Sequence, residues 1–163
     1  MYSCKELLHA LENDTLQDPL RAVYGAGGLG RAKERAVRVT RALLSGFHPE
    51  GNAALFSGPG RTEIGGNHTD HQHGHVLCGS VDMDMLACAA PNGTRRIRVQ
   101  SEGYPFLEVD LDDLAVNPKE ANSSAALIRG VAAKIVQRGY SIGGFDACIT
   151  SSILSGSGVS SSA

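Results

Sequence analysis

The residues best suited to chemistry lie in one polar stretch, residues 57–77, which follows a short apolar run at residues 53–56. Gly58, Pro59 and Gly60 predict a turn at its start. The stretch then carries a dense set of polar side chains: Arg61, Glu63, Asn67, His68, Thr69, Asp70, His71 and Gln72. Carboxylate and amide oxygens accept hydrogen bonds from sugar hydroxyls, while Arg and Asn donate them. We therefore expect a site for a polyhydroxylated ligand; a solvated surface loop is the simpler alternative.

A second stretch, residues 154–163, is rich in glycine and serine and follows an expected strand at residues 144–150. A strand, a Gly-rich turn and the start of a helix would present backbone N–H groups to an anion. The hydroxyl groups of Ser160, Ser161 and Ser162 would reach phosphate oxygens or a magnesium ion. The stretch is not a P-loop, because it lacks Gly-Lys-Ser/Thr. On composition alone, a flexible tail is the favoured interpretation.

The two stretches together resemble motifs of the galactokinases, a family of the GHMP small-molecule kinases. Residues 60–77 are similar to the signature Gly-Arg-x-Asn-x-Ile-Gly-Glu-His-x-Asp-Tyr-x-x-Gly-x-Val-Leu, and residues 154–163 are similar to Pro-x-Gly-x-Gly-Leu-Ser-Ser-Ser-Ala. The departures from these patterns include positions where the family has Asn, Ile, Glu, Tyr and Pro: Glu63, Gly65, Asn67, His71 and Leu154.

The resemblance implies transfer of the γ-phosphoryl group of ATP, with Mg²⁺, to the anomeric hydroxyl of galactose. It places His68 and Asp70 on sugar hydroxyls, with Asn67 in the position of a contacting Glu. It places Arg61 near the transferring phosphoryl group as a catalytic residue, where a fixed cation stabilises developing charge. It assigns the ATP phosphates to residues of the second motif: Gly156, Ser157, Gly158, Ser160, Ser161 and Ser162. Magnesium is assigned to Ser161 and Ser162.

The resemblance also implies a fold and a boundary. It predicts an α+β fold, the N-terminal domain of GHMP kinases, which resembles the second domain of ribosomal protein S5. Residues 1–163 would form an incomplete copy of that domain, about the first two-fifths of a family member, without the C-terminal domain. The family's catalytic Asp follows the Ser-rich loop and lies outside this chain. We therefore expect a truncated chain that is inactive by itself, because half a site does not position the nucleotide.

Three alternatives remain open. A metal site would use a cluster of side chains in the first stretch, namely His68, Asp70, His71, His73 and His75. A non-catalytic galactose and ATP sensor on the same scaffold would tolerate the change at Asn67. A kinase for a related hexose, such as N-acetylgalactosamine, would also fit the altered signature.

Composition narrows the classes of partner. The chain has 163 residues, a formal net charge of −2 and no Trp, which argues against nucleic-acid binding. It has no signal-peptide pattern and no apolar run of membrane-spanning length. Four widely separated cysteines indicate reduced thiols: Cys4, Cys78, Cys88 and Cys148. We therefore expect a cytoplasmic protein.

The remaining pattern predicts the elements that position these stretches. Helices are expected at residues 3–11, 31–44 and 122–138, and the Gly-x-Gly-x-x-Gly run at residues 25–30 is interpreted as a loop. Strands at residues 75–90, 96–100 and 106–111 are expected to form a meander, with the helices on one side of the sheet. The inward face of the third helix would consist of Leu127, Ile128, Val131, Ile135 and Val136.

Overall fold

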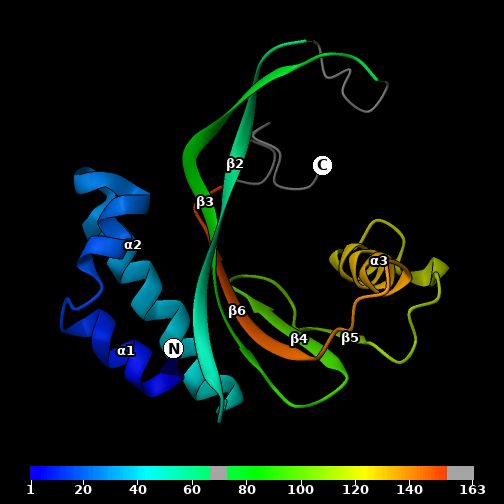
Figure 1. Ribbon diagram of the computed structural model, residues 1–163, viewed down its shortest axis with the longest axis horizontal. Coiled ribbons are helices and arrows are strands. Elements are labelled where there is room, and N and C mark those ends of the chain that lie inside the picture. The colour runs from blue at the N-terminus through cyan, green and yellow to red at the C-terminus, as the bar shows by residue number, and fades with distance from the viewer. Residues whose placement is uncertain (67–72, 154–163) are drawn as a thin grey trace.

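The computed structural model describes residues 1–66 and 73–153, and Figure 1 shows how their helices and strands are arranged. The helices are α1 (Cys4–Glu12), α2 (Gln17–Phe47) and α3 (Ser124–Gln137), with a 3₁₀ turn, η2, at Pro118–Glu120. The strands are β1 (Tyr2–Ser3), β2 (Asn52–Gly65), β3 (Leu77–Pro91), β4 (Arg96–Ser101), β5 (Leu107–Asp110) and β6 (Phe145–Ser151).

The strands form one mixed sheet in the order β1-β2-β3-β6-β4-β5. The α+β prediction is confirmed, but the predicted meander is wrong, because β6 lies between β3 and β4. Most of β6 is buried, as expected of a central strand. The turn between β3 and β4 closes around Gly144, where a Cβ atom would lie 2.6 Å from the carbonyl oxygen of Thr94. The chain thus steps across β6 instead of folding back beside β3.

The helices cover both faces of the sheet, which differs from the prediction that they share one side (Figure 1). Helices α1 and α2 pack on a core that includes Leu43, Leu86 and Cys148. On the opposite face, α3 packs on a smaller core that includes Val109 and Ala147. Because Ala147 and Cys148 are neighbours on β6, the two cores lie on opposite sides of one strand.

Helix α2 is longer than predicted and includes the glycine-rich run. The predicted helix at residues 31–44 is confirmed, but the predicted loop at residues 25–30 is wrong, because those residues continue the helix through a kink at Gly25 (φ 68°, ψ 174°). Leu20 is buried and Tyr24 packs against the same core. Packing on the sheet therefore outweighs the weak helix propensity of glycine.

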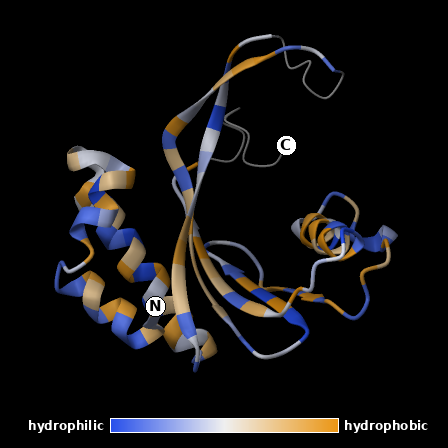
Figure 2. Ribbon diagram, viewed as in Figure 1, coloured by the Kyte–Doolittle hydropathy of each residue, from blue (hydrophilic) through white to orange (hydrophobic). Residues whose placement is uncertain are grey.

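Helix α3 follows its predicted boundaries but exposes much of its predicted inward face. Gly139 follows the helix with φ 86°, as a C-terminal glycine does. Ile128 packs against the core under the helix, whereas Leu127 and Val131 are each 61% exposed. Figure 2 shows apolar residues along α3 in orange. None of the helices in the described ranges is long and apolar enough to cross a membrane.

The four cysteines are free thiols, as predicted, and three of them are buried together between α1 and the sheet. Burial raises the pKa of Cys88 to about 12 and that of Cys148 to about 11, and it also raises the pKa of Cys4. Cys78 is only partly buried. Since the thiolate is the reactive form, the buried thiols are protected both by access and by protonation.

We expect iodoacetamide at pH 8 to alkylate Cys78 first, with the other three at least about tenfold slower. Peptide mass spectrometry over a time course measures the four rates separately. In urea the four rates should converge, which provides the control. Equal rates at Cys78 and Cys88 in the folded protein would contradict the packing described for β3.

Candidate functional site

The β2–β3 hairpin carries the first polar stretch beyond the helices α1 and α2 (Figure 1). The pairing of its strands is interrupted between Pro59, which faces Asp84, and Arg61, which faces Ser80. Gly60 thus opposes three residues of β3, Val81, Asp82 and Met83, so that β3 bulges at this point. Bulges of this kind redirect side chains and are common beside functional sites. Arg61 is the first paired residue of β2 beyond the bulge.

Most of the predicted site residues lie outside the described part of the chain. Arg61 is described and is partly buried. The predicted sugar-binding residues Asn67, His68 and Asp70 lie outside it. So do all the predicted nucleotide and magnesium residues, namely Gly156, Ser157, Gly158, Ser160, Ser161 and Ser162. For these positions the structure describes only the flanking residues, Gly66, His73 and Ile153.

A buried carboxylate, Asp84 of β3, lies beside the end of β6 and the start of the first polar stretch. Asp84 is 4% exposed and accepts three short hydrogen bonds. They come from the Tyr24 hydroxyl (2.6 Å), the Ser57 hydroxyl (2.6 Å) and the Arg35 guanidinium (2.5 Å). Arg35 also donates to the backbone oxygen of Asp84 at 3.1 Å. One carboxylate therefore joins α2, β2 and β3.

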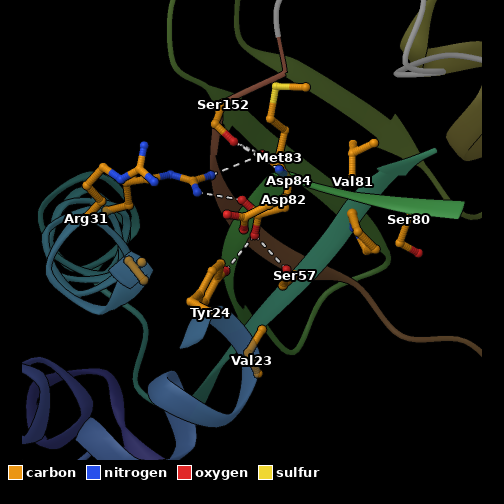
Figure 3. A pocket seen from close by; sticks show the side chains of 14 residues that line it. Val23, Tyr24, Arg31, Ser57, Ser80, Val81, Asp82, Met83, Asp84 and Ser152 are labelled. Atoms are coloured by element: carbon orange, nitrogen blue, oxygen red, sulfur yellow. Dashed lines mark hydrogen bonds and ion pairs between the residues drawn. The ribbon is translucent and has the colours of Figure 1, made fainter. Parts of the chain in front are cut away.

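The backbone of Asp84 binds the end of β6 as well. Its N–H donates to the Ser152 hydroxyl at 2.9 Å, and its carbonyl oxygen accepts from the Ser152 N–H at 2.9 Å. Figure 3 shows Tyr24, Ser57 and Ser152 gathered around Asp84. Ser57 opens the first polar stretch, and Ser152 lies two residues before the second. The start of the first polar stretch and the end of β6 thus meet at Asp84, while β2 stays paired with β3 as far as Gly65.

The electrostatics of the cluster favour an ionised Asp84. Burial by itself raises the pKa of this carboxyl, but the hydrogen bonds from Ser57, Tyr24 and Arg35 lower it more, so the net pKa lies below the ordinary value of 3.8. Burial and the neighbouring Asp84 together raise the pKa of the Tyr24 hydroxyl. Tyr24 therefore stays protonated and remains a donor to the carboxylate at neutral pH.

A cavity of about 830 Å³ opens beside the cluster, between α2 and the β2–β3 hairpin (Figure 3). Arg31 and Arg35 line it from α2, and the bulged residues of β3 line it from the sheet. Arg61 is not among its lining residues. Ser57 and the bulged residues of β3 therefore face this cavity.

The described residues test only part of the proposed metal site. His73 and His75 are described, and the described residues include no group of three His, Cys, Asp or Glu side chains able to hold a metal ion. The other three members of the proposed set, His68, Asp70 and His71, lie outside those residues.

Sequence reasoning missed the residues that organise this region. Arg35 lies in the predicted helix at residues 31–44 but was given no role in the site, and neither were Tyr24 and Ser152. The available signal was Asp84 itself, since a carboxylate on the alternating apolar pattern of β3 needs buried partners. The sequence gives no means of naming those partners, which lie 27 to 68 residues away along the chain.

The chain is similar to known proteins in both sequence and fold. Residues 45–91 match the galactokinase galactose-binding signature. The chain is 31% identical over 118 residues to a galactokinase of Clostridium tetani, covering 72% of this chain and 30% of that protein. It superposes on the crystal structure of Lactococcus lactis galactokinase complexed with galactose with a TM-score of 0.65 at 27% identity, covering 75% of this chain and 32% of that chain.

These matches confirm the predicted resemblance to galactokinases and the GHMP kinase fold. The chain spans about a third of the length of these two relatives.

Gly66 ends the described part of the hairpin, and it provides a test of the local backbone. Its φ is 124°, and a Cβ atom there would lie 2.7 Å from the carbonyl oxygen of His75 and from Val76. We expect Gly66→Ala to open the tip of the hairpin, because both the conformation and the space exclude a side chain. Hydrogen–deuterium exchange of peptides covering residues 61–66 and 73–80 measures the opening.

Gly65→Ala is the matched control, since a Cβ atom at Gly65 meets nothing within 4 Å. Exchange at the tip should rise in the Gly66 variant and stay at the wild-type level in the Gly65 variant. Equal behaviour of the two variants would show that the backbone at Gly66 is not constrained as described.

The charge of Asp84 predicts a pH dependence of stability. Because its folded pKa lies below 3.8, its ionised form stabilises the fold above that pH, and the contribution is lost as pH falls through the lower folded value. We expect Asp84→Asn to cost about 3–5 kcal/mol at pH 7, since it leaves Arg35 without its carboxylate. The difference from wild type should shrink steadily below about pH 4. Urea unfolding at a series of pH values measures it.

Asp112→Asn is the control, because Asp112 pairs with Arg95 at the surface with 69% of its side chain exposed. That variant should lose less than about 1 kcal/mol at any pH. A loss in Asp84→Asn that does not change between pH 7 and pH 3 would mean that Asp84 is not ionised in the fold.

Proposed function

We propose that this chain carries the sugar-binding signature and the first nucleotide-binding loop of a galactokinase-type sugar kinase. The reaction is transfer of the γ-phosphoryl group of ATP to the anomeric hydroxyl of galactose. The observation that carries the proposal is the match of residues 45–91 to the galactokinase galactose-binding signature, and the bonds of Ser57 and Ser152 to Asp84 support it by joining the start of the first polar stretch to the end of β6. A kinase needs its two substrates in one neighbourhood, since catalysis by positioning requires reacting atoms about 3–3.5 Å apart.

The roles follow the order of the two motifs. Asp70, His68 and Asn67 bind the sugar hydroxyls as acceptors and donors. Arg61 lies on β2 between Ser57 and those residues, and the role proposed for its guanidinium is to stabilise charge on the transferring phosphoryl group.

The second motif receives the nucleotide. The backbone N–H groups and hydroxyls of residues 156–162 bind the ATP phosphates. Ser161 and Ser162 would hold Mg²⁺, whose preferred ligands are oxygen atoms. When bound, the ion neutralises charge on the phosphates.

The proposed setting is a cytoplasmic enzyme of carbohydrate metabolism. The 163 residues tested alone are proposed to bind ligands without turnover. They cover only about a third of the length of the two galactokinases compared above. The activity proposed is therefore that of the whole galactokinase-type protein, to which this chain contributes the two motifs.

Ligand titrations of the isotope-labelled 163-residue chain, followed by NMR, test the proposal. Galactose should shift backbone resonances of residues 61–76, and MgATP should shift those of residues 152–163, with dissociation constants on the order of 1 mM for a partial site. Asp70→Asn should remove the galactose shifts and leave those of MgATP. The double variant Ser161→Ala, Ser162→Ala should do the reverse.

Glucose serves as the control sugar, because it differs from galactose at a single hydroxyl. N-acetylgalactosamine tests the alternative substrate, and tighter binding of that sugar would replace galactose in the proposal. Shifts confined to residues around Arg31, or no shifts with either ligand, would overturn the assignment.

A further inference from the structure

We propose that Asp84 is a positioning residue that couples the sugar-binding and nucleotide-binding segments, although it contacts neither ligand itself. The inference rests on the proposed function. It names a residue outside both motifs and predicts that one substitution weakens both ligands together.

The position of Asp84 in β3 is the first argument. On the same face of the strand, Leu86, Cys88 and Ala90 are buried against α1 and α2. From Leu77 to Met83, toward the tip of the hairpin, no residue of β3 is buried. Asp84 is thus the last buried residue before the hairpin leaves the sheet. From Leu86 to Ala90 apolar packing holds β3 in place. At Asp84 the hydrogen bonds to its carboxylate do so instead.

The origin of its donors is the second argument. Tyr24 and Arg35 lie on either side of the kink of α2 at Gly25, so the carboxylate holds both limbs of the helix. Ser57 holds β2 four residues before Arg61. Four elements therefore depend on one buried charge: α2, β2, β3 and the end of β6.

The contact with Ser152 is the third argument, because it connects the charge to the second motif. Ser152 makes a reciprocal backbone and hydroxyl pair with Asp84, at 2.9 Å in each direction. This pair uses the backbone of Asp84, next to the point where Met85 pairs with Ser151. The side chain of the same residue bonds to Ser57, so Asp84 touches both the first polar stretch and the end of β6.

The substitution Asp84→Asn removes the negative charge and keeps the size of the side chain. An amide oxygen accepts from Tyr24 or Ser57, but the amide NH₂ would face the Arg35 guanidinium, where two donors oppose each other. Asp84→Asn should thus release the cluster while conserving volume. Tyr24→Phe is the milder variant, because it removes one donor that is remote from both motifs.

A second buried carboxylate in the same sheet offers a matched control. Asp146, at the other end of β6, is 2% exposed and accepts from Arg98 at 2.7 Å and from Asn92 at 2.7 Å. Asp146→Asn should therefore destabilise the fold by a comparable amount. Asp146 bonds to neither Ser57 nor Ser152 in the described structure, so the proposal expects no loss of ligand binding beyond that explained by unfolding.

The test measures galactose and MgATP affinity of the wild-type chain and these variants by the same NMR titration, at a temperature where all are folded. We expect Asp84→Asn to weaken both ligands by about tenfold or more, the scale of one buried hydrogen bond to a charged group. Tyr24→Phe should weaken both ligands by a smaller factor, and Asp146→Asn neither. Hydrogen exchange of residues 151–163 should rise with Asp84→Asn and Ser152→Ala, and the double variant should add little to either.

The outcomes separate the two proposals. If the wild-type chain binds neither ligand, the proposed function fails. If the wild type binds and Asp84→Asn binds equally well, or if it loses only one ligand, the coupling role is overturned. Equal losses in Asp84→Asn and Asp146→Asn would reduce the role of Asp84 to stability alone. If Asp84→Asn does not fold, Tyr24→Phe and Ser152→Ala decide the question by the same measurements.

Discussion

The junction of α2 with the β2–β3 hairpin depends on one desolvated charge. Burying the carboxylate of Asp84 costs several kcal/mol unless its oxygens are fully bonded. Three donors from Tyr24, Arg35 and Ser57 meet that requirement, and each belongs to a segment that must stay in place for the bonds to form. Displacing any of these donors would leave the carboxylate without a bond, so only one relative position of α2 and the hairpin is favourable. Apolar packing alone would be less selective, because it tolerates changes of contact.

Burial on β6 explains why the sheet has its order. Asp146, Ala147, Cys148 and Thr150 are all buried, so this strand has to be covered on both faces and flanked on both edges. The insertion of β6 between β3 and β4 meets both needs, since α2 covers one face and α3 the other. The same insertion brings the end of β6 beside Asp84, so the topology of the sheet is what joins the second motif to the first.

Local pattern was sufficient to predict most elements, because their signals are short in range. The capping box of Ser3 and Glu6, the alternation of β3 and the glycine after α3 all act within a few residues. The partners of β6 and the helical state of residues 25–30 depend on contacts distant in sequence, and those predictions were wrong. The same holds for the candidate site. The two motifs could be found in the sequence, whereas Tyr24, Arg35 and Ser152 around Asp84 could not, because their contacts are distant in sequence.

The distribution of broken local rules supports a functional origin for the hairpin region. Exceptions occur in both halves of the sheet, since Asp146 beside Arg98 of β4 is a second buried charge and Asn122 before α3 has φ 61°. Helix α2 and the β2–β3 hairpin carry four: the buried Asp84, the kink at Gly25, the bulge before Arg61 and Gly66 at φ 124°. Each exception costs stability, and such costs persist where the surrounding structure imposes them for a purpose. Those on α2 and the hairpin are expected if stability was exchanged for the placement of substrates.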